Sequence, residues 1–291
     1  MISIIICSRG PSVNTELLDN IKATVGVEYE VVVIDNSKNR YSIFEAYNIG
    51  VAKSNYAFLC FMHDDIWYHT ENWGQKVIRH FNHDLTGAIG VAGSPYAPQM
   101  AGSWWGGGLV NQSLVITDGP APKTVVKSVT RNVSVKDQVV VLDGIWMCVR
   151  KSLFSTIRFD SRSYTGYHFY DADIAMQITR LGYEIYCIYD VLLAHFSKGD
   201  MNGNWVENAV VFRNKWKQVL PVSCTALSYA ARCDAELATL REYTAVMAAN
   251  NYPQKKIYKL AVTQIIQYYK GYFHYKTPLH LFRYFLKYLA R

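Results

Sequence analysis

Ten consecutive residues set the architecture of the chain, Tyr56-Ala57-Phe58-Leu59-Cys60-Phe61-Met62-His63-Asp64-Asp65. Seven apolar residues, rich in aromatic rings, are followed at once by a histidine and two carboxylates. A short run that is apolar on both faces is typical of a central strand in a sheet that is covered on both sides. The polar residues then lie at the carboxyl end of the strand, where open α/β sheets bind their ligands.

The two adjacent carboxylates, Asp64 and Asp65, repel each other unless a cation lies close to both. Carboxylate oxygens suit Mg²⁺ and Mn²⁺, and these ions commonly also hold the phosphates of a substrate. The sequence therefore predicts a divalent metal site at this strand end. A solvated acidic turn is the alternative, because acidic residues are common in turns.

The segments around this strand predict a β-α-β-α-β order. Residues 2–7 and 28–35 are apolar runs typical of buried strands, and residues 42–51 have the periodicity of an amphipathic helix. A helix that begins near Ser12 or Asn14 separates the two strands. Parallel strands joined by right-handed crossovers follow from this order, so their polar ends meet at one edge.

Three strand ends would line that edge, and together they indicate a nucleotide site. Asp35 can accept hydrogen bonds from a ribose or a base, and Ser8 and Arg9 can reach a base or a diphosphate. Neither Gly-x-Gly-x-x-Gly nor Gly-x-x-x-x-Gly-Lys is present, which argues against a dinucleotide fold and a P-loop. A metal ion, and not a glycine cradle, would then neutralise the diphosphate.

Further along, a helix is predicted over 72–80 and a strand over 88–93, whereas residues 94–136 have no clear periodicity. Within them, Trp104 and Trp105 precede three glycines. Exposed aromatic rings beside flexible glycines suit a sugar-stacking loop or a lid. A loop anchored in the core, with hinge glycines, is the alternative.

An aspartate at the start of a later helix is a candidate base. A strand over 139–150, interrupted at Asp143, leads to a helix that begins near Asp171 and ends at Gly182. Asp171 can be a simple N-cap, or it can take a proton from a hydroxyl nucleophile. The helix dipole is expected to lower its pKa. A strand over 184–189 then leads to His195.

Length and composition allow one large α/β domain with an appendage, or two modest domains. The 291 residues are 50% hydrophobic, enough for a substantial core. Six scattered cysteines form no Cys-x-x-Cys pair, so neither a disulfide framework nor a zinc cluster is predicted. No run approaches the ~20 apolar residues of a membrane span, and the N-terminus has no signal-peptide pattern. The chain is therefore expected to be cytoplasmic.

The net charge of +7 is concentrated at the C-terminal end, since eight cationic residues and no acidic residue follow Glu242. In residues 277–291 the basic side chains recur every three or four residues, opposite a face of aromatic and aliphatic ones. Such a helix suits the surface of an anionic membrane, which would make the protein peripheral on its inner face. A helix packed on the body is the alternative. Nucleic-acid binding is not expected, because the body is near neutral and carries no recognition motif.

The order of these features resembles the inverting glycosyltransferases of family 2, which have the GT-A fold. The resemblance covers residues 1–220 and leaves 221–291 as a helical extension. It implies a mostly parallel α/β sheet flanked by helices. His63-Asp64-Asp65 corresponds to the family's metal motif, with histidine in the first acidic place. The resemblance implies Asp65 as the main metal ligand, Asp64 and His63 beside it, and His195 as the late histidine that completes the site.

The same resemblance assigns the other site residues. On the donor side it implies Cys7, Ser8 and Arg9 at the base, Asp35 at uracil and ribose, and Asn48 before the metal strand. The family's acidic signature corresponds to Tyr170-Asp171-Ala172-Asp173, with tyrosine in place of glutamate. This makes Asp171 the catalytic base and Asp173 its support or an acceptor contact. The acceptor side is expected at Trp104, Trp105, Asp143 and Asp173.

The function implied is inverting transfer of a sugar from a nucleotide-diphosphate donor to a hydroxyl of a glycan or lipid-linked acceptor, as in polysaccharide synthesis. The resemblance implies Mn²⁺ or Mg²⁺ as the cofactor and UDP as the nucleotide of the donor. The substitutions in both acidic motifs keep open a non-catalytic protein that binds a sugar or nucleotide-sugar. A sugar-phosphate nucleotidyltransferase is disfavoured, because residues 7–11 lack the glycine-rich basic loop that it needs.

Overall fold

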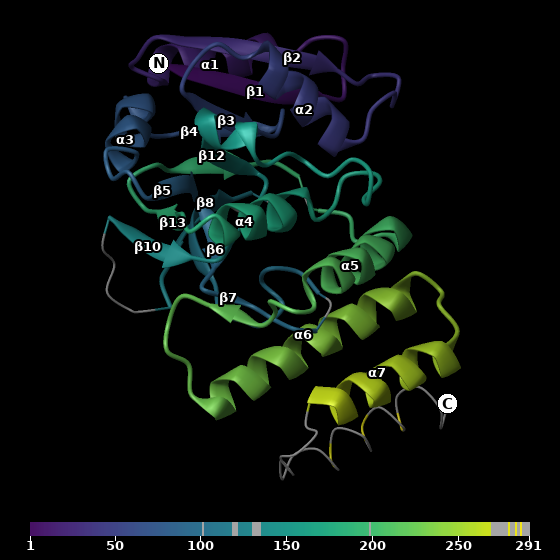
Figure 1. The fold of residues 1–291 in the computed structure, drawn as a ribbon. Coiled ribbons are helices and arrows are strands. Elements are labelled where there is room, and N and C mark those ends of the chain that lie inside the picture. Colours follow the sequence, from purple (N-terminus) through teal and green to yellow (C-terminus); the bar gives the residue numbers. More distant parts are fainter. Residues whose placement is uncertain are drawn as a thin grey trace.

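In the computed structural model, a twisted sheet lies between layers of helices, and a pair of C-terminal helices packs below it (Figure 1). The structure describes residues 1–100, 102–117, 122–129, 135–197 and 199–268, together with Leu279, Arg283 and Leu286. The basic helix predicted for 277–291 lies outside these described residues, apart from those three positions. No helix in the described part of the chain is both long and apolar enough to cross a membrane.

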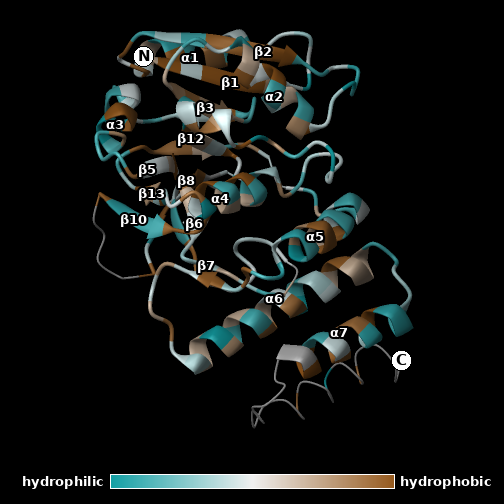
Figure 2. Ribbon diagram, in the orientation of Figure 1, coloured by the Kyte–Doolittle hydropathy of each residue, from teal (hydrophilic) through white to brown (hydrophobic). Residues whose placement is uncertain are grey.

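The main sheet has seven strands in the order β10-β13-β5-β12-β3-β1-β2. Strands β1 (Ile2–Ser8), β2 (Tyr29–Asp35) and β3 (Phe58–Met62) are parallel, as the sequence predicts. In Figure 2 β1 and β2 are largely hydrophobic, and the side chains of β1 are almost entirely buried. The ten-residue stretch thus supplies an internal strand, and His63 follows directly at its carboxyl end.

Two strands run against the other five of the main sheet. β12 (Trp146–Arg150) lies between β3 and β5 (Thr86–Gly90) and is antiparallel to both. β13 (Glu184–Ile188) is parallel to β5, and β10 (Lys136–Val139) closes that edge in antiparallel orientation. The sheet is therefore mixed.

The helices on the two faces begin where the sequence places them. Asn14 caps α1 (Thr15–Thr24), and Ser42 forms a capping box with Glu45 at the start of α2 (Ile43–Lys53). Helix α3 (Trp73–His80) follows β4 (Ile66–Tyr68), and a 3₁₀ turn, η1 (Lys151–Ser155), follows β12. Helix α4 (Tyr170–Arg180) starts after Phe169, whose backbone is left-handed.

A second sheet corrects the prediction that 94–136 is irregular. Strands β7 (Tyr96–Ala97), β8 (Asn111–Ile116) and β9 (Lys123–Lys127) lie within that segment. The strands predicted over 88–93 and 139–150 are each divided, because β6 (Ala92–Ser94) and β11 (Val141–Leu142) belong to the second sheet. There β8 pairs with β14 (Leu193–His195) and β9, and β14 pairs with β4. These strands are short, so they carry too little periodicity to be recognised.

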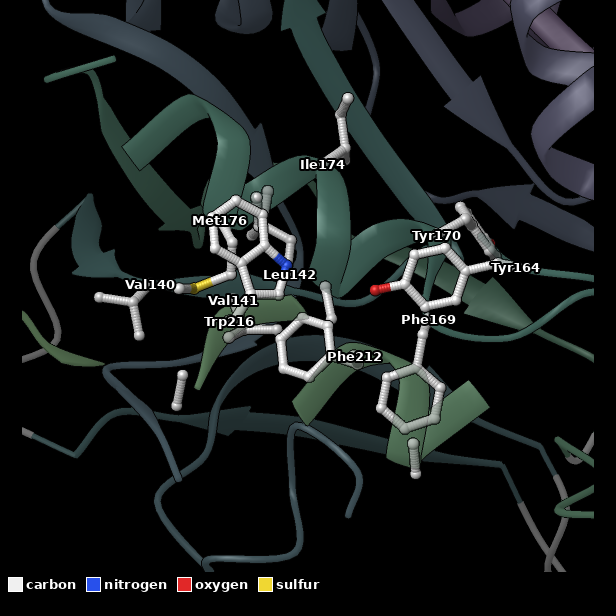
Figure 3. Packing of buried hydrophobic residues seen from close by; sticks show 14 of the residues in the cluster. Val140, Val141, Leu142, Tyr164, Phe169, Tyr170, Ile174, Met176, Phe212 and Trp216 are labelled. Atoms are coloured by element: carbon white, nitrogen blue, oxygen red, sulfur yellow. The ribbon is translucent and has the colours of Figure 1, made fainter. Parts of the chain in front are cut away.

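The C-terminal part is helical, as predicted. After α5 (Gly203–Trp216) and β15 (Val222–Ser223), the chain forms α6 (Tyr229–Ala249) and α7 (Gln254–Tyr268). Their apolar side chains belong to the same buried cluster as those of α4 and α5. Figure 3 shows part of this cluster, where Val141 and Leu142 from β11 lie near Phe212 and Trp216 from α5. The core therefore continues across residue 220.

Candidate functional site

The carboxyl ends of β1 and β3 open onto a cavity of about 570 Å³. The second sheet, the start of α4, the loop after β14, and α5 complete its wall. It brings together ten of the predicted site residues: Cys7, Arg9, His63, Asp64, Asp65, Trp104, Trp105, Asp143, Asp171 and His195. One hollow thus collects the predicted donor, metal, base and acceptor groups.

Three of these side chains form a candidate metal site. The nearest ligand atoms of His63, Asp65 and His195 all lie within 4.8 Å of one another. Asp65 Oδ1 is 3.4 Å from His195 Nε2 and 3.9 Å from His63 Nδ1. Both oxygens of Asp65 are buried without a hydrogen bond of ordinary geometry among the described residues. Buried carboxylate oxygens that lack such hydrogen bonds and lie beside two imidazoles fit a divalent cation.

The protonation states of His63 and Asp65 suit a metal ligand. Burial alone would raise the pKa of Asp65, but His195 and Ser197 hold it well below its usual value. Burial and the neighbouring His195 lower the pKa of His63, which keeps its imidazole neutral. His63 Nε2 lies 3.1 Å from the Tyr170 hydroxyl, so Nδ1 faces Asp65 and His195. An ionised carboxylate and a neutral imidazole are the forms that bind a metal.

Asp64 is held by Arg9. The Arg9 guanidinium contacts Asp64 Oδ1 through Nε at 3.2 Å and NH2 at 2.9 Å, and the Arg9 amide donates to Oδ2 at 3.0 Å. NH2 also approaches Asp65 Oδ2 at 3.3 Å. The Arg9 side chain is 71% exposed, so it is free to turn toward an anionic ligand. Asp64 therefore orients the arginine, and Asp65 faces the histidines.

Asp171 lies in the first turn of α4, and its carboxylate is held from two sides. Oδ2 accepts a hydrogen bond from the Gly144 amide at 2.9 Å, and Oδ1 accepts one from the Ala172 amide at 2.8 Å. Burial, and then the charge of Asp143, raise the pKa of Asp171 to about 7. The lowered pKa expected from the helix dipole is wrong, because the loss of hydration outweighs the dipole.

Trp104 and Asp143 form the wall beside Asp171. The Trp104 indole donates to Asp143 Oδ2 at 2.7 Å, and Asp143 Oδ1 accepts from the Ile145 amide at 2.8 Å. The Trp105 ring packs edge-on against Trp104 with centroids 5.3 Å apart, and Trp105 is 38% exposed. One ring of the pair is anchored and the other is accessible.

Three predicted donor residues lie apart from this cavity. The Asp35 carboxylate is exposed and accepts a hydrogen bond from the Ser37 amide at 2.9 Å. Ser8 is buried, and its hydroxyl donates to the Ser12 carbonyl at 3.3 Å. The Asn48 side chain binds both backbone groups of Phe159, at 2.7 and 3.1 Å. Here Asn48 joins α2 to a loop.

Asp173 also has a structural role. It is fully buried, and it accepts hydrogen bonds from the Tyr164 hydroxyl at 3.1 Å and the Trp216 indole at 2.9 Å. The Lys215 ammonium lies 2.8 Å from the same carboxylate. This network fastens α4 to α5 and does not face the cavity.

Two residues of the candidate site, Tyr170 and Ser197, were not predicted from the sequence. The Tyr170 hydroxyl orients His63, and its place directly before Asp171 was the available signal. Ser197 lies 3.3 Å from His195 Nε2 and lines the cavity, but no spacing in the sequence indicates it. Tyr170 acts through His63, whereas Ser197 acts on both His195 and Asp65.

Comparisons with known proteins identify the family and the fold of the chain. A model of the glycosyltransferase-like family matches residues 3–215. No curated protein matches the chain. Residues 1–349 of TarS from S. aureus superpose with a TM-score of 0.53 at 13% identity, covering 91% of this chain and 80% of that one. This likeness confirms the GT-A fold.

Two other solved structures are more distant. A mannosyltransferase of Pyrobaculum calidifontis, in complex with GDP-Man and Mn²⁺, has a TM-score of 0.45 at 12% identity, over 99% of this chain and 86% of that one. GalNAc-T7 with UDP, GalNAc and Mn²⁺ has a TM-score of 0.47 at 12% identity, over 69% of this chain and 44% of that one.

Proposed function

Because this chain belongs to the glycosyltransferase-like family, we propose that it carries out metal-dependent, inverting transfer of a sugar from a nucleotide-diphosphate donor to an acceptor hydroxyl. One observation carries the proposal. The cluster of His63, Asp65 and His195 and the carboxylate of Asp171 line the same cavity. Transfer needs both a charge that stabilises the leaving diphosphate and a base for the incoming hydroxyl.

The metal-binding residues would be Asp65, His63 and His195. A divalent ion held by them supplies positive charge to the leaving diphosphate. Imidazole nitrogen is a better ligand for transition metals than for Mg²⁺, so a set with two histidines favours Mn²⁺ over Mg²⁺. Arg9 is placed to add a second positive charge at the same edge, because it already spans Asp64 and Asp65.

Asp171 would act as the base. Its carboxylate takes the proton of the acceptor hydroxyl, and the oxygen forms a bond to the anomeric carbon. The bond from that carbon to the diphosphate oxygen breaks, and its electron pair leaves with the diphosphate. Attack from the face opposite the leaving group inverts the configuration. The amides of Gly144 and Ala172 fix the carboxylate, so positioning lowers the barrier.

The nucleotide is proposed to be UDP, from the resemblance to family 2, and the acceptor a glycan or lipid-linked glycan. Thermal shifts with UDP, GDP, CDP and ADP, each with Mn²⁺, Mg²⁺ or EDTA, test the donor and the metal together. We expect the largest stabilisation with UDP and Mn²⁺. The variant Asp65→Asn should lose the Mn²⁺-dependent part, whereas Asp84→Asn, an exposed aspartate elsewhere, should keep it.

Hydrolysis of UDP-sugars separates an enzyme from a binding protein. Turnover that requires Mn²⁺ and falls in Asp171→Asn supports transfer. The replacements of acidic residues by His63 and Tyr170 favour the alternative, a protein that only binds a nucleotide-sugar. Specific UDP stabilisation without hydrolysis, or without transfer to any of a panel of glycan acceptors, would support that alternative. No stabilisation by any nucleotide would contradict both functions.

We also propose that the C-terminal extension docks on an anionic membrane at the cytoplasmic face, near a lipid-linked acceptor. Helix α7 buries Ile257 and exposes Lys255, Lys256 and Lys259. In a flotation experiment with phosphatidylglycerol vesicles, the wild type should float with the vesicles. The variant in which these three lysines are replaced by glutamate should not float. The matched control replaces the exposed lysines 22, 38 and 53 in the same way. Equal flotation of both variants would contradict docking through α7.

A further inference from the structure

We propose that helix α6 supports the acceptor side of the cavity, because its Glu236 and Glu242 hold in place the segment 96–108, which carries Trp104. These two are positioning residues that act through Trp104 and Asp143. The inference rests on the proposed function. It goes beyond the family match, which ends at residue 215, whereas α6 begins at Tyr229.

Glu236 binds the start of this segment. Its side chain is fully buried, and Oε1 accepts hydrogen bonds from the Tyr96 hydroxyl at 2.7 Å and the Gln99 amide at 2.8 Å. Oε2 accepts a third from the Met100 amide at 2.9 Å. Arg213 on α5 donates to the Gln99 carbonyl at 3.1 Å. A buried carboxylate is costly unless donors satisfy it, so this set of bonds fixes the backbone around Gln99.

Glu242 binds the segment next to the tryptophans. Its Oε2 accepts from the Ser103 amide at 3.1 Å and from the Ser103 hydroxyl at 2.5 Å. Ser103 directly precedes Trp104, so the backbone that orients the indole is tied to α6. A hydrogen bond to a charged group is about twice as strong as a neutral one.

Glycines let the segment lie flat on the helix. Residues 235, 239 and 242 recur at helical spacing and so share one face of α6. A Cβ at Gly106 would lie 2.6 Å from Glu242 Oε2 and 3.3 Å from Thr239 Cα, and one at Gly107 would lie 3.3 Å from Ala235 Cβ. The glycines beside the tryptophans therefore serve close packing on α6, which a lid that swings free would not need.

The segment leads to the base. Trp104 donates to Asp143 Oδ2, and the charge of Asp143 contributes to the raised pKa of Asp171. Displacement of Trp104 would admit water beside Asp143 and Asp171. The extension thus influences the catalytic carboxylate through one indole, in addition to adding buried surface.

Two variants test the inference without removing a core residue. Glu242→Gln keeps the shape and loses the charge, and Gly106→Ala places a methyl group against Glu242. The matched control is Glu207→Gln, an exposed glutamate on α5. Hydrogen exchange of the peptide 96–108 reports how well the backbone amides of the segment are protected. The pH dependence of UDP-sugar hydrolysis with Mn²⁺ reports Asp171, and the thermal shift with UDP and Mn²⁺ reports the donor side.

In both variants we expect exchange at the Ser103 amide to rise by about tenfold or more, since a charge-assisted bond is weakened. The pH midpoint of hydrolysis should fall below that of the wild type, because hydration of Asp143 and Asp171 relieves the effects that raise the pKa. The UDP and Mn²⁺ shift should stay unchanged, and the control should match the wild type throughout.

A purely structural role would lower the melting temperature and leave the exchange pattern and the midpoint unchanged, and that result would overturn the inference. Should Glu242→Gln not fold, Ser103→Ala removes the hydroxyl bond to Glu242 from the other side and leaves the amide bond in place. Hydrogen exchange does not depend on turnover. A wild type without hydrolysis but with faster exchange in the variants would therefore contradict the proposed function alone and leave α6 as the support of the Trp104 segment.

Discussion

Asp171 shows how a single residue acquires its chemistry from its surroundings. Its amide partners, Gly144 and Ala172, favour the ionised carboxylate, whereas burial and the charge of Asp143 favour the protonated form. The balance leaves its pKa at about 7. A base with a pKa near the working pH combines sufficient ionisation with a strong affinity for the proton.

Activity should therefore rise with pH through a midpoint near 7 as Asp171 ionises. The variant Asp171→Asn should lose about 10²–10⁴-fold in transfer or hydrolysis at pH 8, because it cannot accept the proton. Its fold should persist, since asparagine keeps the shape of the side chain and its one carbonyl oxygen can still accept one of the two amide bonds. Initial rates between pH 5 and 9 check this. A wild-type rate that is flat across pH 6–8 would contradict the assignment.

The same carboxyl links pH to stability, with a definite sign. Its folded pKa of about 7 lies above the ordinary value of 3.8, so the folded state binds more protons between these two pH values. Stability from this group is complete below about pH 4 and is lost as the pH rises toward 7. Urea unfolding of the metal-free protein should show a steeper decline from pH 4 to 7 for the wild type than for Asp171→Asn. Parallel curves would contradict the raised pKa.

Among the elements, those with long apolar runs were predictable and those with short ones were not. Residues 56–62 are a continuous apolar run, residues 2–7 are interrupted only by Ser3, and residues 28–35 contain the apolar run 31–34. The order of the parallel strands follows from these runs. β12 is equally apolar, but nothing in its sequence indicates that it runs antiparallel between β3 and β5. β7 has two residues and β11 has two, which is too few for a periodic pattern.

The candidate site was predictable where side chains follow the ends of such runs. His63 and Asp65 are placed by β3, and Asp171 by the start of α4. His195 is brought to them by β14, which pairs with β4 in a second sheet that the sequence does not indicate. Asp35 shares the strand edge but points to solvent, because a position at an edge does not fix the direction of a side chain.

Asn48 gives a prediction at the scale of two elements. Its side chain fastens α2 to the backbone of Phe159, a role that a helix near a nucleotide site does not reveal in sequence. Replacement by alanine leaves a carbonyl and an amide of the loop unpaired, at a cost of about 1–3 kcal/mol. Urea unfolding of Asn48→Ala should show this loss, while the thermal shift with UDP and Mn²⁺ keeps its size. Loss of the ligand shift at unchanged stability would instead place Asn48 at the donor.

At the scale of the whole molecule, the helical extension and the body share one core. Leu240 and Tyr243 of α6 and Ile257 of α7 are buried in the same cluster as Phe212 and Phe169. Figure 3 shows the last two. Residues outside the family match therefore stabilise the helices that wall the cavity. A basic, aromatic tail does not reveal in sequence that the helix α6 before it packs on the segment beside the cavity.

We therefore expect the full chain to unfold in one transition. Leu240→Ala removes a buried side chain and should lower the free energy of unfolding by about 2–5 kcal/mol, moving that single transition to lower temperature. Calorimetry with tryptophan fluorescence checks this, because Trp205 and Trp216 lie in the body. A change at Leu240 confined to a separate transition, with the tryptophan signal unmoved, would show instead that α6 unfolds independently. A shared transition makes the integrity of the cavity depend on residues more than twenty positions beyond the matched region.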